Sequence, residues 1–137
     1  MESFSKKRYL DGSYEIDYEF DDPVNEEAPY VMCSIAVEPK VSDALISHKA
    51  MQAGINIGFA AEGKVELVER NDLFQWGDAS KFSLILSGGA PVGMVFSARK
   101  KRHVFLLSIS GVYSDDSVAI EELLVKPLLA LERLPAP

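Results

Sequence analysis

The chain has 137 residues, of which 47% are hydrophobic and 26% charged, as expected for one folded domain rather than a disordered segment. Its net charge of −7 repels phosphate backbones and makes nucleic acid a poor partner. The single cysteine, Cys33, excludes an internal disulfide, and no apolar run approaches the roughly 20 residues of a membrane-spanning helix.

The first predicted elements are a lead-in and two strands. Residues 1–12 are expected to be a flexible lead-in that ends in the Asp11-Gly12 turn. Strict alternation of apolar and polar residues over 13–20 predicts a strand with one buried face. A loop with two prolines, 21–29, leads to a strand at 30–37 that is apolar on nearly both faces and should lie inside a sheet.

A helix is predicted next, with Ser42 as its N-cap and Gly63 at its end. Apolar and small residues recur in it at helical spacing, which indicates a helix lying on a sheet. The stripe expected to face the sheet consists of Ile46, Ala50, Ala53, Gly54, Ile57 and Ala61.

The second half of the chain predicts four more strands and a last helix. The strands are expected at 65–70, 80–87, 92–98 and 103–111, joined mainly by short turns. Ser114, Asp115 or Asp116 should cap the helix, which contains Pro127 and the apolar residues Ala119, Ile120, Leu123, Leu124, Leu128 and Leu131.

This order, β-β-α-β-β-β-β-α, predicts one α+β domain over residues 13–134, followed by a short tail at 135–137. Strands joined by short turns favour an antiparallel sheet, here of about six strands, with both helices packed on it.

Motifs for catalysis or cofactors are incomplete. Residues 58–65 have the spacing of a phosphate-binding loop, but Val65 stands where Ser or Thr would hold magnesium, and the loop follows a helix instead of a strand. Cys33, His48 and His103 do not have the spacing of a zinc site, which leaves a packing cysteine or, less favoured, a Cys–His pair. We therefore predict no cofactor and no catalytic residue.

A candidate calcium site is the Asp17-x-Glu19-x-Asp21 pattern, which resembles the start of a calcium-binding loop. The pattern lacks the central glycine and the bidentate glutamate, and it overlaps the alternating strand at 13–20. A solvated strand face is the favoured interpretation.

The charge distribution predicts a protein partner. Nine acids and no Lys or Arg lie between Asp11 and Glu38, whereas residues 99–102 form a basic run. An acidic surface suits a basic partner, although it also serves solubility. Two alternatives are open for Trp76: its side chain either anchors a partner from a loop or fills the core. The predicted partner-binding residues are Asp21, Asp22, Glu26, Glu27, Phe74 and Trp76.

The layout resembles the PsbP-like fold group, which includes photosystem extrinsic proteins, Ran-binding Mog proteins, DcrB-type bacterial lipoproteins and adaptors of type VI secretion effectors. The resemblance covers residues 13–134 and rests on element order and hydrophobic spacing. The segments that carry it are 42–45 (SDAL), 65–67 (VEL), 82–86 (FSLIL), 92–96 (VGMVF), 104–108 (VFLLS) and 114–116 (SDD).

The resemblance implies a non-catalytic bacterial protein-binding module, for which we expect the role of an immunity-type inhibitor or an adaptor of a secreted effector or toxin. The alternatives are a hydrolase with clustered carboxylates and a structural envelope lipoprotein. Residues 1–10 lack the apolar core of a signal peptide, so a cytoplasmic location is expected for the sequence as written, or a periplasmic, lipid-anchored one if a leader precedes it.

Overall fold

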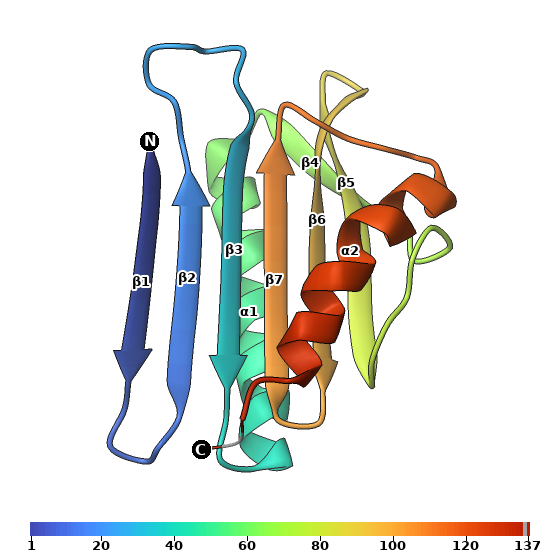
Figure 1. Cartoon of the computed structure of the whole chain (residues 1–137). Helices are drawn as coiled ribbons and strands as arrows, with labels where there is room; N and C mark the ends of the chain where they lie inside the picture. Colours follow the sequence, from blue (N-terminus) through green and yellow to red (C-terminus); the bar gives the residue numbers. More distant parts are fainter. Residues whose placement is uncertain (136) are drawn as a thin grey trace.

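The chain folds into an antiparallel sheet of seven strands with one helix on each face (Figure 1). The computed structural model describes residues 1–135 and 137, so part of the predicted tail lies outside the described residues. The strand order across the sheet is β1-β2-β3-β7-β6-β5-β4. The elements are β1 (Glu2–Arg8), β2 (Tyr14–Phe20), β3 (Tyr30–Val37), α1 (Val41–Glu62), β4 (Val65–Glu69), β5 (Ala79–Ser87), β6 (Ala90–Lys100), β7 (His103–Ser110) and α2 (Ser117–Glu132).

The predicted α+β class, the antiparallel sheet and the order of the elements from β2 onward are confirmed. The alternation in β2 also has the predicted consequence. Ile16 and Tyr18 pair with Ile35 and Cys33 of β3, and the face that these residues share packs toward α2. The acids of β2 therefore lie on the opposite face, toward α1.

β1 is an additional strand, and it occupies residues predicted to be a flexible lead-in. It pairs with β2 in a regular antiparallel register through a hairpin at Gly12, whose φ of +91° suits glycine. Every residue of β1 is exposed. A strand that is wet on both faces carries no alternation of apolar and polar residues, and for this reason the sequence pattern did not reveal it.

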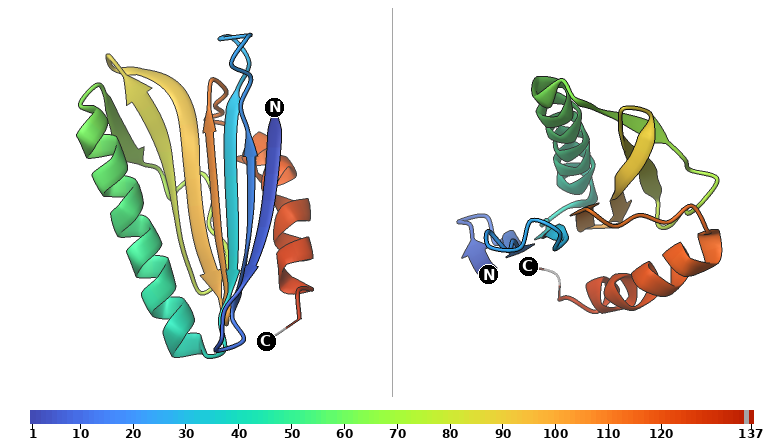
Figure 2. Two further views of the ribbon diagram at one scale, coloured as in Figure 1. Left: turned by 90° about the vertical axis from the view of Figure 1, so that its left-hand side faces the viewer. Right: turned by 90° about the horizontal axis from the view of Figure 1, so that it is seen from above.

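α2 covers the part of one face formed by β5, β6 and β7 (Figure 2). Asp116 caps its N-terminus by accepting a hydrogen bond from the Val118 backbone at 3.0 Å, which confirms one of the three predicted caps. Its inner face is nearly fully buried against a group of phenylalanine rings on the sheet. The residues of this core include Ile120, Leu124, Leu128 and Leu131 of α2 and Phe82, Phe96 and Phe105 of the sheet.

α1 lies on the other face, but in a different rotation from the predicted one. Ile46 and Ile57 of the predicted stripe are 67% and 70% exposed. The residues that pack toward the sheet are Ala44, His48, Met51, Ile55 and Phe59. The helix also begins at Val41 with Lys40 at the N-cap and no side-chain cap, so the prediction of Ser42 as the cap was wrong.

Candidate functional site

A groove runs along α1 because this helix covers only part of its face of the sheet. α1 contacts β4, β6 and β7, while β1 and β2 extend past it on one side (Figure 2). Only Ala44 and His48 of its 22 residues are buried, so its C-terminal half lies loosely over the strands. Two hollows result, one on each side of Met51.

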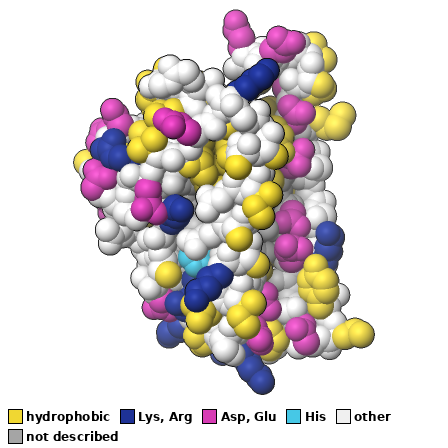
Figure 3. Space-filling view, turned by 180° about the vertical axis from the view of Figure 1, so that it is seen from behind, with side chains coloured by type: hydrophobic (Ala, Val, Ile, Leu, Met, Phe, Trp, Pro, Cys, Tyr) yellow, Lys and Arg dark blue, Asp and Glu magenta, His cyan; other side chains and the backbone are white. Residues whose placement is uncertain are grey.

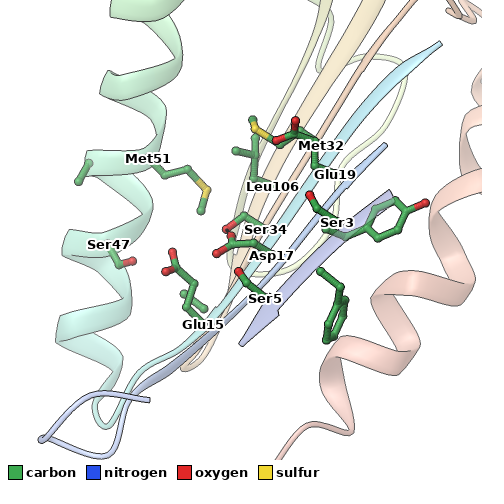
Figure 4. Close-up of a pocket in the computed structure, with 14 residues that line it drawn as sticks. Ser3, Ser5, Glu15, Asp17, Glu19, Met32, Ser34, Ser47, Met51 and Leu106 are labelled. Carbon is green, nitrogen blue, oxygen red and sulfur yellow. Dashed lines mark hydrogen bonds between the residues drawn. The ribbon is translucent and has the colours of Figure 1, made fainter. Parts of the chain in front are cut away.

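The first hollow has an acidic wall. It encloses about 630 Å³ between α1 and strands β1 to β3. Glu15, Asp17 and Glu19 project from alternate positions of β2 into it, and Met32, Met51 and Leu106 form its apolar floor (Figure 4). We refer to Glu15, Asp17 and Glu19 as the acidic wall.

The second hollow is apolar and encloses about 750 Å³ beneath the C-terminal half of α1. Gly54 and Gly58 of α1 line it, and the absence of their side chains leaves room between helix and sheet. Met32, Met51 and Leu106 line both hollows, so the two form one continuous groove. Its other apolar lining residues include Ile55, Phe59, Val65, Ile85, Val92 and Val95.

The acidic wall carries charge that is only partly compensated, since Lys7 of β1 lies opposite Glu15 in the strand register. None of its three carboxylates forms an ion pair with the described residues 1–135 and 137. Asp17 accepts a hydrogen bond from the Ser34 hydroxyl at 2.7 Å, and Glu15 accepts one from the Tyr9 hydroxyl at 3.2 Å. These neutral donors orient the carboxylates without cancelling their charge, and Figure 3 shows acidic side chains gathered along this border of the molecule.

The electrostatic environment beside the wall is negative as well. Burial raises the pKa of the Glu38 carboxyl, and the charges of Asp11, Asp43 and Glu15 raise it further, while a hydrogen bond from Ser47 lowers it. Like charges therefore accumulate at this end of the groove, as would suit a cation.

The predicted acidic loop borders the other end of the groove. Asp21, Asp22 and Glu26 line a small hollow together with Tyr30 and Gly111, and these last two residues also line the apolar hollow. Glu27 is exposed in the same loop. The acids of the loop and of the wall thus lie around one groove.

Phe74 and Trp76 lie elsewhere. Phe74 packs against Phe96 with ring centroids 5.1 Å apart, on the face covered by α2. Trp76 is half-buried against the same core, and the Lys100 ammonium lies 5.5 Å from its ring centroid. The structure therefore does not bring these two aromatics together with the acidic loop, and Trp76 fills the core, which was the alternative open at the sequence level.

Histidine and cysteine do not converge. His48 Nε2 lies 3.3 Å from the Ser97 hydroxyl, a pair that the sequence did not suggest, but both residues are buried beneath α1 at 3% and 2% exposure. Cys33 lies on the opposite face, where burial raises the pKa of its thiol to about 11. His103 Nε2 donates a hydrogen bond to the Leu134 carbonyl, 2.9 Å away.

The cation and phosphate patterns form no site in the part of the chain described. Asp17 and Glu19 belong to the acidic wall, and no group of three His, Cys, Asp or Glu side chains among residues 1–135 and 137 is placed to hold a metal ion. Residues 58–65 run from the end of α1 through Gly63 in the left-handed conformation into β4, so no helix N-terminus faces a phosphate there.

Sequence reasoning missed the groove. The sequence pattern favours a solvated strand face for the acids of the wall, and it assigns no role to the methionines of the floor. The available signal was Met32 and Met51, since methionine is common at adaptable binding surfaces.

Comparisons with protein-family models, with curated proteins and with solved structures found no significant match for this chain. Within residues 1–135 and 137, neither helix is both long and apolar enough to span a bilayer.

Proposed function

We propose that this chain is a non-catalytic protein-binding domain, and that its groove holds a basic, amphipathic segment of a partner protein. The observation that carries the proposal is the position of the acidic wall directly beside an apolar floor. A segment with Lys or Arg on one side and aliphatic side chains on the other complements both parts.

The two parts of the groove would make different contributions to binding. Carboxylates without ion-pair partners attract and orient a cationic segment, with an effect that salt screens. The apolar floor would hold the segment by burying its aliphatic side chains, and the methionines can adapt to their shapes. The acids of the loop 21–29 extend the attraction to the far end of the groove.

Such a domain acts by occupying or presenting a segment of its partner, so the role we propose is that of an inhibitor or adaptor. A secreted effector with an exposed basic segment is the partner that fits this chemistry. The hydrolase alternative would use carboxylates of the same acidic wall as its acid and base. Activity on a panel of generic hydrolase substrates that is lost in E15Q/D17N/E19Q would favour it over binding.

The test uses a synthetic amphipathic peptide with Lys and Leu on opposite sides, and a matched peptide with Glu in place of Lys. The Lys peptide should bind, and the E15Q/D17N/E19Q variant should bind it about tenfold more weakly or worse, because each lost charge contact contributes up to about 1 kcal/mol. Isothermal titration calorimetry measures both affinities.

The matched control is E66Q/E121Q/E122Q, which changes the net charge equally at exposed positions outside the groove. It should change the affinity by less than about threefold. Equal weakening by both triple variants would mean that only the net charge matters, and equal binding of both peptides would refute recognition by the acidic wall.

A further inference from the structure

β1 forms an open edge of the sheet. Its seven residues are all exposed, and Phe4 is 70% exposed. The register with β2 continues from Glu2 to Arg8 without a bulge, and neither proline nor a covering helix blocks the outer side. An edge of this kind presents free backbone groups to another strand.

The free backbone groups belong to the even-numbered residues of β1. At its two ends the hydrogen bonds to β2 involve odd-numbered residues: Asp21 donates to the Met1 carbonyl at 3.0 Å, and Tyr9 donates to the Ser13 carbonyl at 2.9 Å. Hydrogen-bonded pairs alternate along an antiparallel ladder. The N–H and C=O groups of Glu2, Phe4, Lys6 and Arg8 therefore point outward.

The side-chain charges of this edge are self-complementary. If a second β1 pairs antiparallel about Ser5, Glu2 lies opposite Arg8, and Phe4 lies opposite Lys6. Both are pairs of even-numbered residues, so every outward backbone group finds a partner in this register. Neither Glu2 nor Arg8 forms an ion pair among residues 1–135 and 137, which leaves both charges available.

We propose that a second copy of this chain binds at β1, in antiparallel register about Ser5, to form one sheet continuous across two molecules. The neighbouring registers of the two β1 strands give less favourable charge pairing. Centring on Lys6 places two lysines opposite each other, and centring on Phe4 leaves Arg8 beyond the paired strand.

This arrangement also involves the acidic wall. On the face toward α1, Lys7 lies opposite Ser3 of the second copy, and Ser3 pairs with Glu19 within its own chain. Within its own chain Lys7 lies opposite Glu15, so in the dimer each lysine would lie between the acidic wall of its own chain and that of the other molecule. The two-fold axis keeps both grooves on the same face of the joined sheet, so a dimer would hold two partner segments side by side.

Sedimentation equilibrium of the full chain, from micromolar to millimolar concentration, measures dimerisation of the wild type and of variants in which the charges at Glu2 and Arg8 are exchanged. The wild-type chain should dimerise. E2R and R8E should each weaken dimerisation about tenfold or more, since each places like charges opposite one another twice in the dimer. The double variant E2R/R8E restores opposite charges and should return dimerisation to within about threefold of wild type.

E121R and R133E make the same changes in charge at exposed sites away from the edge and should leave dimerisation unchanged. K6P removes one outward N–H and should give a folded monomer, with the fold checked by circular dichroism. A monomeric wild-type chain over the whole range, or a double variant as weak as the single ones, would overturn the proposal.

Discussion

The thiol, the imidazoles and the carboxylates of this chain lie in different environments. Cys33 is half-buried against the apolar core on the face of α2, and His48 is buried on the opposite face in contact with the Ser97 hydroxyl. The polar groups that do face a hollow are carboxylates, and their neighbours are hydroxyl donors such as Ser34 and Tyr9. At the residue scale the accessible chemistry is therefore charge recognition.

The burial of His48 links folding to pH. Burial lowers the pKa of its imidazole, and the nearby positive charge of Arg99 lowers it further. In the unfolded chain this group protonates near its ordinary pKa of about 6.5. The unfolded state therefore binds more protons as the pH falls through that value toward the lowered pKa of the folded state, so the free energy of unfolding should decrease from about pH 7 to pH 5.

His48→Gln should flatten this dependence. The variant should lose about 1 kcal/mol at pH 7, because the contact with Ser97 is altered, and should lose less relative to wild type at acidic pH. Urea unfolding at several pH values measures the slopes. A slope identical to that of wild type would show that the proton uptake arises at another group.

The two helices differ in how they serve the fold. Four of the 16 residues of α2 are buried, whereas only two of the 22 residues of α1 are. α2 therefore completes the core, and α1 leaves space between itself and the strands for the groove. The largest buried cluster therefore lies on the face of α2, whereas the face of α1 has two smaller clusters and the groove.

This difference predicts unequal costs of truncation along α2 itself. Leu124 is 1% exposed and Leu123 is 44% exposed at the next position. Leu124→Ala should lower the free energy of unfolding by about 2–5 kcal/mol, because it removes buried methyl groups and leaves a cavity in the core. Leu123→Ala should cost less than about 1 kcal/mol. Chemical denaturation measures the free energy of unfolding of both variants, and equal losses of stability would contradict the orientation of α2 on the sheet.

The sequence predicted those elements whose two faces differ in polarity. β2 and the inner face of α2 were predicted correctly because their apolar residues recur at the strand and helix periods. β1 was missed because it is wet on both faces. The face of α1 was predicted wrongly because apolar residues occur on both sides of the helix. The exposed stripe with Ile46 and Ile57 fits the helical period as well as the stripe that packs on the sheet does.

The groove could not be predicted from local patterns. Glu15, Met32, Met51 and Leu106 come from four different elements, and only the strand order brings them together. The acids of loop 21–29 were recognisable from charge alone. Phe74 and Trp76 were misplaced because a loop position in sequence does not reveal whether an aromatic side chain turns outward or into the core.

At the scale of the whole molecule, the proposed groove and the proposed edge use different parts of the same hairpin. The groove needs the side chains of β2, while self-association needs the outward backbone of β1. Different variants, charge substitutions in β2 and K6P in β1, therefore test the two properties. Two molecules of net charge −7 also repel each other at long range, so the attraction between Glu2 of one copy and Arg8 of the other has to act at short range.

The acidic wall should be unfavourable to folding, because three carboxylates without ion-pair partners lie at alternate positions of one strand. E15Q/D17N/E19Q should therefore raise the free energy of unfolding by about 0.5–1 kcal/mol at low salt, with a smaller gain at high salt. E66Q/E121Q/E122Q, whose carboxylates are all exposed to solvent, should change it by less than about 0.5 kcal/mol. Thermal and urea unfolding measure both. Groups that cost stability yet line a groove are explained by binding, whereas a marked loss of stability in the first variant would assign the wall a structural role instead.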